Sequence, residues 1–110
     1  MRVLMGTDVE GVAGVVSFDA QSRPTGRYYD QTKRLATAEV NAAVEGLLAA
    51  GAEDVLVIDG HGPGGLSFED IHPEARLLHG RPVAPRAEQS ESHPEQPVDR
   101  LLQTQRLLYR

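Results

Sequence analysis

The chain has no cysteine and no tryptophan, and aromatic residues make up only 5% of its 110 residues. Without cysteine, disulfide bridges, cysteine-ligated zinc, iron–sulfur clusters and thiol nucleophiles are all excluded. Any metal site formed by this chain must therefore use oxygen and imidazole ligands.

Long hydrophobic runs and an excess of positive charge are also missing. The apolar stretch Val12–Val16 is short and interrupted by glycine, and no signal-peptide core precedes the first strand-like run. We therefore expect a cytoplasmic protein without a membrane partner. The formal net charge is -5, so the basic surface that nucleic-acid binding needs is absent, and we expect no nucleic-acid partner.

The residues that are present predict one small α/β domain. Two short apolar runs, Arg2–Thr7 and Asp54–Asp59, are typical of buried strands. Between them, small and apolar residues recur at helical spacing from Ala36 to Leu47, and Gly51 suits a helix C-cap. This order predicts a βαβ unit, in which two parallel strands are neighbours joined by a right-handed crossover.

The segments after the second strand divide the chain into two parts. Ser67–Asp70 predicts a capped helical turn and Ala75–His79 a third short strand, which gives a three-layer α/β half-domain over residues 1–80. Four of the seven prolines fall within residues 81–100, so we expect residues 81–110 to be a divergent, mostly disordered tail. A helical face near the chain end predicts a short terminal helix; its residues are Val98, Leu101, Leu102, Leu108 and Tyr109.

Carboxylates and a histidine follow the two main strands. Asp8 and Glu10 would project to the same side if the strand continued through them, and Gly11 permits a tight turn. Their mutual repulsion favours a divalent cation. His61 follows the neighbouring strand, and parallel strands lie about 4.8 Å apart. Asp8, Glu10 and His61 therefore form a candidate site for zinc or manganese, with Asp59 as a supporting carboxylate that orients the imidazole or as a further ligand.

Two other interpretations remain open for these residues. Asp8 and Glu10 also suit a solvated strand end, and His61 a turn histidine bonded to its own loop. The run Gly60–Gly65 also suits a phosphate- or nucleotide-binding loop, because such loops follow strands. The run lacks both the Lys-Ser/Thr pair of a P-loop and the G-x-G-x-x-G spacing of dinucleotide sites.

Taken together, the motifs of residues 1–80 resemble those of the zinc-dependent D-aminopeptidases of the dipeptide-transport operon type. Their order and spacing carry the resemblance more specifically than any single motif. The matching pieces are Asp8-Val9-Glu10-Gly11 with Gly14, the helical segment Arg34–Gly46 with Thr37, Glu39 and Asn41, the strand Val55–Asp59 with Gly60-His61, and His72-Pro73-Glu74-Ala75 followed by Leu77 and Gly80.

This resemblance implies a two-zinc aminopeptidase that forms a ring-shaped homo-oligomer and hydrolyses short peptides with an N-terminal D-residue. Asp8, Glu10 and His61 are then implied as metal ligands, with Asp8 bridging two ions. The family's remaining ligands, a Gly-x-His histidine and a glutamate, and its further catalytic histidine have no match here, and His93 lies in a different context. No catalytic residue is therefore assigned.

We accordingly expect a truncated or frame-disrupted product that holds at most one of the two zinc ions well and has little activity alone. A non-catalytic metal-binding fragment or interaction module is the alternative that this expectation leaves open.

Overall fold

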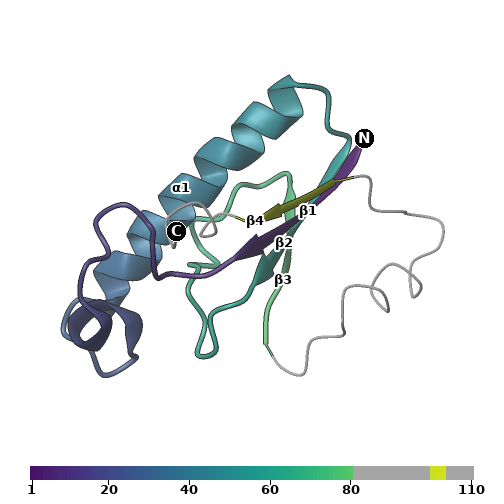
Figure 1. Cartoon of the computed structure of the whole chain (residues 1–110). Coiled ribbons are helices and arrows are strands. Elements are labelled where there is room, and N and C mark those ends of the chain that lie inside the picture. Colours follow the sequence, from purple (N-terminus) through teal and green to yellow (C-terminus); the bar gives the residue numbers. More distant parts are fainter. Residues whose placement is uncertain (81–99, 104–110) are drawn as a thin grey trace.

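The computed structural model describes residues 1–80 and 100–103. The three strands expected within residues 1–80 are all present, as is the long helix (Figure 1). In chain order the elements are β1 (Arg2–Thr7), the π-helical turn η1 (Phe18–Ser22), α1 (Tyr29–Ala49), β2 (Asp54–Asp59), β3 (Ala75–Leu78) and β4 (Arg100–Gln103).

All neighbouring strands in the sheet are parallel, and their order is β3-β2-β1-β4. Thr7, the last residue of β1, pairs with Asp59, the last residue of β2. The two strands therefore end level with each other, and the segments that follow them leave the sheet at the same edge. Residues far apart in the sequence are brought together at this edge, as the βαβ prediction requires.

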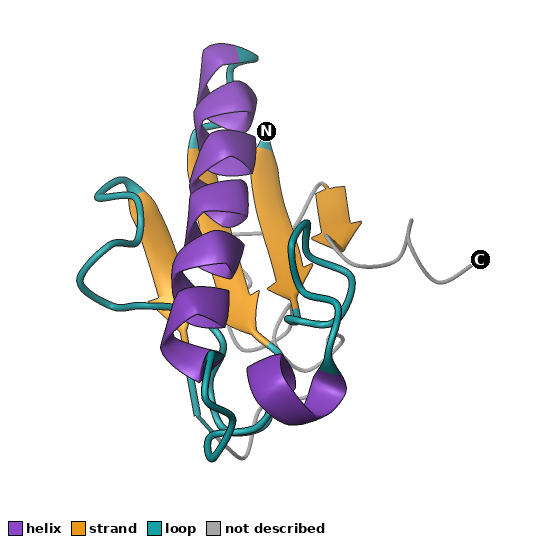
Figure 2. Cartoon of the chain, turned by 90° about the vertical axis from the view of Figure 1, so that its left-hand side faces the viewer, coloured by secondary structure: helices purple, strands orange, loops and turns teal. Residues whose placement is uncertain are grey.

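Helix α1 lies across one face of the sheet (Figure 2). Its side chains Ala36, Val40 and Val44 are buried in one cluster with residues of β1 and β2. They recur every four residues, so they share the face of the helix that packs on the strands. The α/β class is confirmed. Among the described residues, α1 covers this one face of the sheet. None of the described helices or strands forms the third layer of the expected three-layer arrangement.

The end of α1 has the glycine cap that the sequence predicts. Gly51 has φ +99°, its N–H donates to the carbonyl of Leu48, and the N–H of Ala52 donates to the carbonyl of Leu47. This pair of bonds is the Schellman motif, in which a residue with positive φ satisfies the last helical carbonyls. The chain then reverses within a few residues and enters β2.

Polar side chains of α1 hold the segment between β2 and β3. The N–H of Ser67 donates to Thr37 Oγ1 at 2.9 Å, while Asn41 donates to the carbonyl of Asp70 and accepts from the N–H of His72. The carbonyl of Ser67 accepts from the N–H groups of Asp70 and Ile71, which is the bonding of the single helical turn expected at Ser67–Asp70. Thr37 and Asn41, which belong to the motifs that carry the family resemblance, therefore anchor the loop between β2 and β3.

Strand β4 corrects the expectation of a terminal helix for Arg100–Gln103. These residues pair in parallel with β1, from Val3 opposite Arg100 to Gly6 opposite Gln103. Without them this edge of β1 would leave backbone N–H and C=O groups unpaired, and pairing outweighs a weak helical pattern. The rest of the expected tail and terminal helix, residues 81–99 and 104–110, lies outside the described residues.

Across the ranges 1–80 and 100–103, no helix is long and apolar enough to cross a membrane.

Met5 offers a test of the core, because its side chain is fully buried in β1, which lies between β2 and β4. We expect Met5→Ala to lower the free energy of unfolding by about 2–5 kcal/mol, because it removes buried volume that the sheet cannot refill. Urea unfolding followed by circular dichroism measures the change. Val16→Ala is the matched control: Val16 is 91% exposed, and its loss should change stability by no more than about 0.5 kcal/mol. Equal effects of the two substitutions would contradict this assignment of the core.

Candidate metal centre

A tight turn directly after β1 places the first two candidate ligands. The N–H of Val12 donates to the carbonyl of Val9, and Gly11 has φ +93°, a conformation that glycine adopts without steric strain. We expected Asp8 and Glu10 to project to the same side of a continuing strand. The strand instead ends at Thr7, and the turn brings the side chains of Asp8 and Glu10 together.

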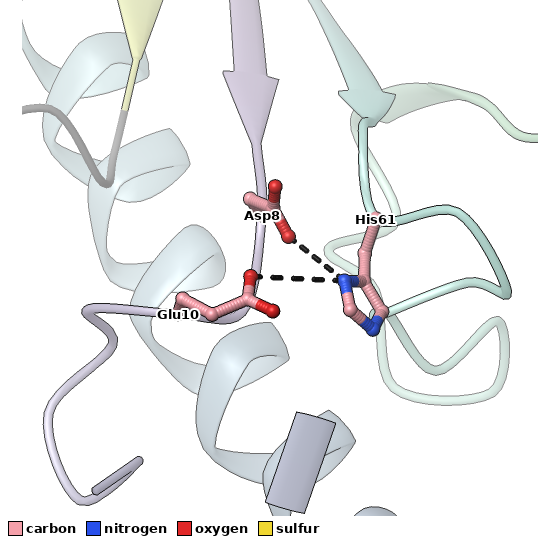
Figure 3. Close-up of side chains that lie close together, drawn as sticks. All are labelled: Asp8, Glu10 and His61. Atoms are coloured by element: carbon pink, nitrogen blue, oxygen red, sulfur yellow. Dashed lines mark hydrogen bonds and ion pairs between the residues drawn. The ribbon is translucent and has the colours of Figure 1, made fainter. Parts of the chain in front are cut away.

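Asp8, Glu10 and His61 converge on one point at the edge of the sheet (Figure 3). His61 Nδ1 lies 2.9 Å from Asp8 Oδ1 and 3.8 Å from Glu10 Oε2. One ligand atom from each of the three residues lies within 4.8 Å of the other two. The imidazole is only 9% exposed and the two carboxylates are partly buried. The three predicted ligands therefore form one cluster.

A backbone carbonyl orients the imidazole of His61. Its Nε2 lies 2.7 Å from the carbonyl oxygen of Ser22. Because a carbonyl only accepts, Nε2 carries the hydrogen. In the neutral ring Nδ1 then has a lone pair, and that lone pair faces the carboxylates of Asp8 and Glu10. A cation among these groups would replace repulsion by attraction, and a second ring nitrogen held by a carbonyl is the usual arrangement for a metal-binding histidine.

Gln21 fixes the loop that supplies the Ser22 carbonyl. Its side-chain oxygen accepts from the N–H groups of Val16 and Ser17, and its amide donates to the carbonyl of Gly14. The side chain of Gln21 is buried among these bonds. Sequence reasoning did not find Ser22, because a backbone carbonyl has no residue-type signal.

Asp59 supports the site through the backbone of the loop that carries His61. Its carboxylate accepts from the N–H of His61 at 3.3 Å, from Gly65 and from Leu66, and it also lies 3.2 Å from His79 Nδ1. The ring of His61 is held by the carbonyl of Ser22. Asp59 was expected to orient this imidazole, but its carboxylate contacts the backbone N–H of His61 instead. The sequence predicts His79 only as the end of a strand, so the contact with Asp59 is visible only in the structure.

Glycine residues in the run Gly60–Gly65 let this loop pack closely against its neighbours. A Cβ added to Gly65 would lie 2.5 Å from Val9 Cγ1 and 3.2 Å from the His61 Cβ, so only glycine lets the loop approach the cluster so closely. The N–H groups of Gly65 and Leu66 already donate to the Asp59 carboxylate. A phosphate would compete for these donors with a fixed negative charge, which argues against the phosphate-binding interpretation.

Tyr29 closes the cluster on the side of α1. Its hydroxyl donates to the carbonyl of Gly64, and its ring centroid lies 6.1 Å from that of His61. Burial, with smaller contributions from Asp59 and other carboxylates, raises the pKa of Tyr29. The hydroxyl therefore keeps its proton and its hydrogen bond at neutral pH.

The electrostatics of the cluster favour a cation. Burial raises the pKa of Glu10, and its hydrogen bond and charge interaction with Asp8 raise it further. Two carboxylates that face one imidazole lone pair are a donor set that suits Zn²⁺ or Mn²⁺, with coordination positions left for other groups. Asp8, Glu10 and His61 are the residues that would hold such an ion.

The parallel α/β sheet carries an oxygen–imidazole donor set at its carboxyl edge, which is where open α/β sheets bind their ligands. The comparisons with known proteins are more specific. The family model for D-aminopeptidases matches residues 1–88. This chain belongs to the D-aminopeptidase family, which confirms the resemblance seen in the sequence.

A similar solved structure is described as the "Zn-dependent D-aminopeptidase DppA from Bacillus subtilis, a self-compartmentalizing protease". It is 30% identical to this chain with a TM-score of 0.70, and the match covers 74% of this chain and 30% of that one. The present chain thus corresponds to under a third of that relative. No curated protein matches the chain.

The position of His61 predicts its effect on metal affinity. We expect His61→Ala to weaken zinc binding at least tenfold, since loss of residues that merely support a ligand weakens metal binding by about 10–100-fold. Isothermal titration with zinc measures the affinity. His72→Ala is the matched control, because His72 pairs with Glu45 outside the cluster. Unchanged affinity in His61→Ala would remove this residue from the site.

The raised pKa of Glu10 predicts a conflict between stability and metal binding. A carboxyl group with a raised pKa stabilises the fold below its ordinary value of 4.5, where it is protonated, and this contribution is lost as pH rises through the raised pKa. Glu10→Gln stays neutral. The metal-free variant should therefore match the parent chain at acid pH and be more stable at pH 7, while its zinc affinity falls.

Urea unfolding from acid to neutral pH in the presence of a chelator measures this difference. Glu74→Gln, at an exposed position, should follow the parent chain at each pH. A Glu10→Gln variant that is less stable than the parent at pH 7 without metal would contradict the argument.

Proposed function

We propose that this chain supplies the Asp8, Glu10 and His61 part of a zinc-dependent D-aminopeptidase centre that hydrolyses short peptides with an N-terminal D-residue. The observation that carries the proposal is the convergence of two carboxylates on His61 Nδ1, with Nε2 held by the Ser22 carbonyl. Membership of the D-aminopeptidase family and the zinc dependence of the Bacillus subtilis relative support it.

Zinc bound here would polarise a substrate carbonyl and lower the pKa of a bound water to near 7. The chain's own residues prepare the place where that chemistry occurs. Asp8 and Glu10 supply negative charge, and the Ser22 carbonyl keeps the His61 lone pair turned toward them. Asp59 and Gly65 fix the loop behind His61, so the donor atoms need little rearrangement to bind an ion.

The proposed extent of the centre is limited by its ligands. Three donors hold one ion well, whereas a two-ion centre of the kind the family resemblance implies needs further histidine and carboxylate ligands. The match covers only 30% of the relative. We propose that the missing ligands belong to a segment equivalent to the unmatched part of that relative. The chain alone should therefore bind zinc but hydrolyse peptides poorly.

We also propose that the active form is a homo-oligomer in the cytoplasm. The description of the relative as a self-compartmentalizing protease supports the oligomer.

The activity is tested best by completing the centre. The 110-residue chain is compared with a chimera in which everything after residue 80 is replaced by the corresponding part of the Bacillus subtilis relative, both with zinc. Release of D-alanine from D-Ala-D-Ala and from D-alanine p-nitroanilide measures turnover. We expect activity in the chimera and little in the chain alone, because efficient two-metal hydrolysis needs both ions held about 3.5–4 Å apart.

His61→Ala in the chimera should lower kcat/KM by more than about 100-fold, beyond the loss typical of a supporting residue. His72→Ala should leave it unchanged. A folded, zinc-loaded chimera without turnover would overturn the peptidase proposal and favour a non-catalytic metal-binding module.

A further inference from the structure

A small cavity lies against the glycine loop that also carries His61, at Pro63 and Gly64. Its volume is about 250 Å³, below the roughly 300–1,000 Å³ of sites for drug-sized ligands. Its lining includes Lys33, Leu66, Phe68, Glu69 and His79. The metal cluster uses none of these residues, and the cavity is large enough for one amino-acid residue of a ligand.

The His79 ring, which lines this cavity, carries a hydrogen-bond acceptor. Its Nδ1 lies 3.2 Å from the buried carboxylate of Asp59, which only accepts, so Nδ1 carries the hydrogen. In the neutral ring Nε2 is then an acceptor. The ring is held between Phe68, which it meets edge-on at 4.8 Å, and Gly64, where an added Cβ would lie 2.6 Å from His79 Cε1.

Charged and apolar groups complete the cavity. Lys33, near the start of α1, supplies a positive charge, and no described residue pairs with its ammonium group. Leu66 and Phe68 supply apolar surface. Glu69 lines the same cavity and opposes the attraction that Lys33 exerts on an anion. The cavity therefore combines a cation, an apolar wall and an acceptor for an N–H group.

These three features match the C-terminal residue of a peptide, which has a carboxylate, a side chain and an amide N–H. We infer that the cavity binds this residue of a short peptide substrate: Lys33 binds the carboxylate, Leu66 and Phe68 contact the side chain, and His79 Nε2 accepts from the amide. The choice of a peptide ligand rests on the proposed function.

A single carboxylate connects this subsite to the metal cluster. One oxygen of Asp59 accepts from the N–H of His61, and the other lies beside His79 Nδ1. Gly64 and Gly65 pack against His79 and His61 respectively. The two sites therefore share one carboxylate and one glycine loop, and a short peptide that occupied both would place its amino end at the cluster and its carboxyl end in the cavity.

The test uses a probe that needs neither zinc nor turnover. N-acetyl-D-alanine, which has the amide, the methyl side chain and the carboxylate, is titrated into the full, metal-free chain while the His79 imidazole signals are followed by NMR. We expect saturable shifts with a Kd of about 1–10 mM, a range suited to so small a ligand. Two analogues serve as controls: the methyl ester, which lacks the charge, and N-acetyl-N-methyl-D-alanine, which lacks the N–H. Each should bind at least about fivefold more weakly.

Matched variants separate the charges. Lys33→Met should raise the Kd about fivefold, Glu69→Gln should lower it about twofold, and Arg27→Met, which removes an exposed cation outside the cavity, should leave it unchanged. Absence of saturable binding, equal binding of acid and ester, or no effect of Lys33→Met would overturn the subsite. Zinc affinity in His61→Ala is measured independently, so failure here is distinguishable from failure of the proposed metal centre.

Discussion

The carboxylate of Asp59 is the interaction on which the loop architecture of this edge depends. It is buried at the end of β2, with its side chain 1% exposed, and a buried charge is tolerated only when hydrogen bonds satisfy it. Backbone N–H groups of His61, Gly65 and Leu66 do so. In satisfying Asp59, the loop folds back on itself, so that it carries His61 near its start and packs Gly64 against His79, which follows β3.

Parallel strand pairing supplies the second constraint. Because β1 and β2 end in register, the turn after Thr7 and the loop after Asp59 start from adjacent positions. The turn at Gly11 then adds Glu10 to Asp8, and two partly buried carboxylates face the same imidazole. Without metal, burial and the neighbouring carboxylate raise the pKa of Glu10, so its ionisation is less favourable than that of a solvated carboxyl group. The arrangement therefore lowers the stability of the metal-free fold in return for a ready donor set.

Much of this site was predictable from residue types and order. Strand ends can be read from apolar runs, and the carboxyl ends of parallel neighbours share one edge, so Asp8, Glu10 and His61 were expected together. The supporting contacts were not predictable in the same way. The Ser22 carbonyl has no side-chain signature, and the contact between Asp59 and His79 joins the ends of two strands that are 20 residues apart. Neither leaves a local pattern in the sequence.

The sequence by itself determined the α/β class, the limits of β1 and β2, the glycine cap of α1 and the identity of the candidate ligands, because apolar periodicity and glycine preferences act over a few neighbouring residues. The tertiary structure decided the turn that brings Asp8 and Glu10 together, the partner of each imidazole and the strand pairing of Arg100–Gln103. These features depend on which backbone groups remain unpaired once the sheet has formed, and that is a property of the assembled chain rather than of any short segment.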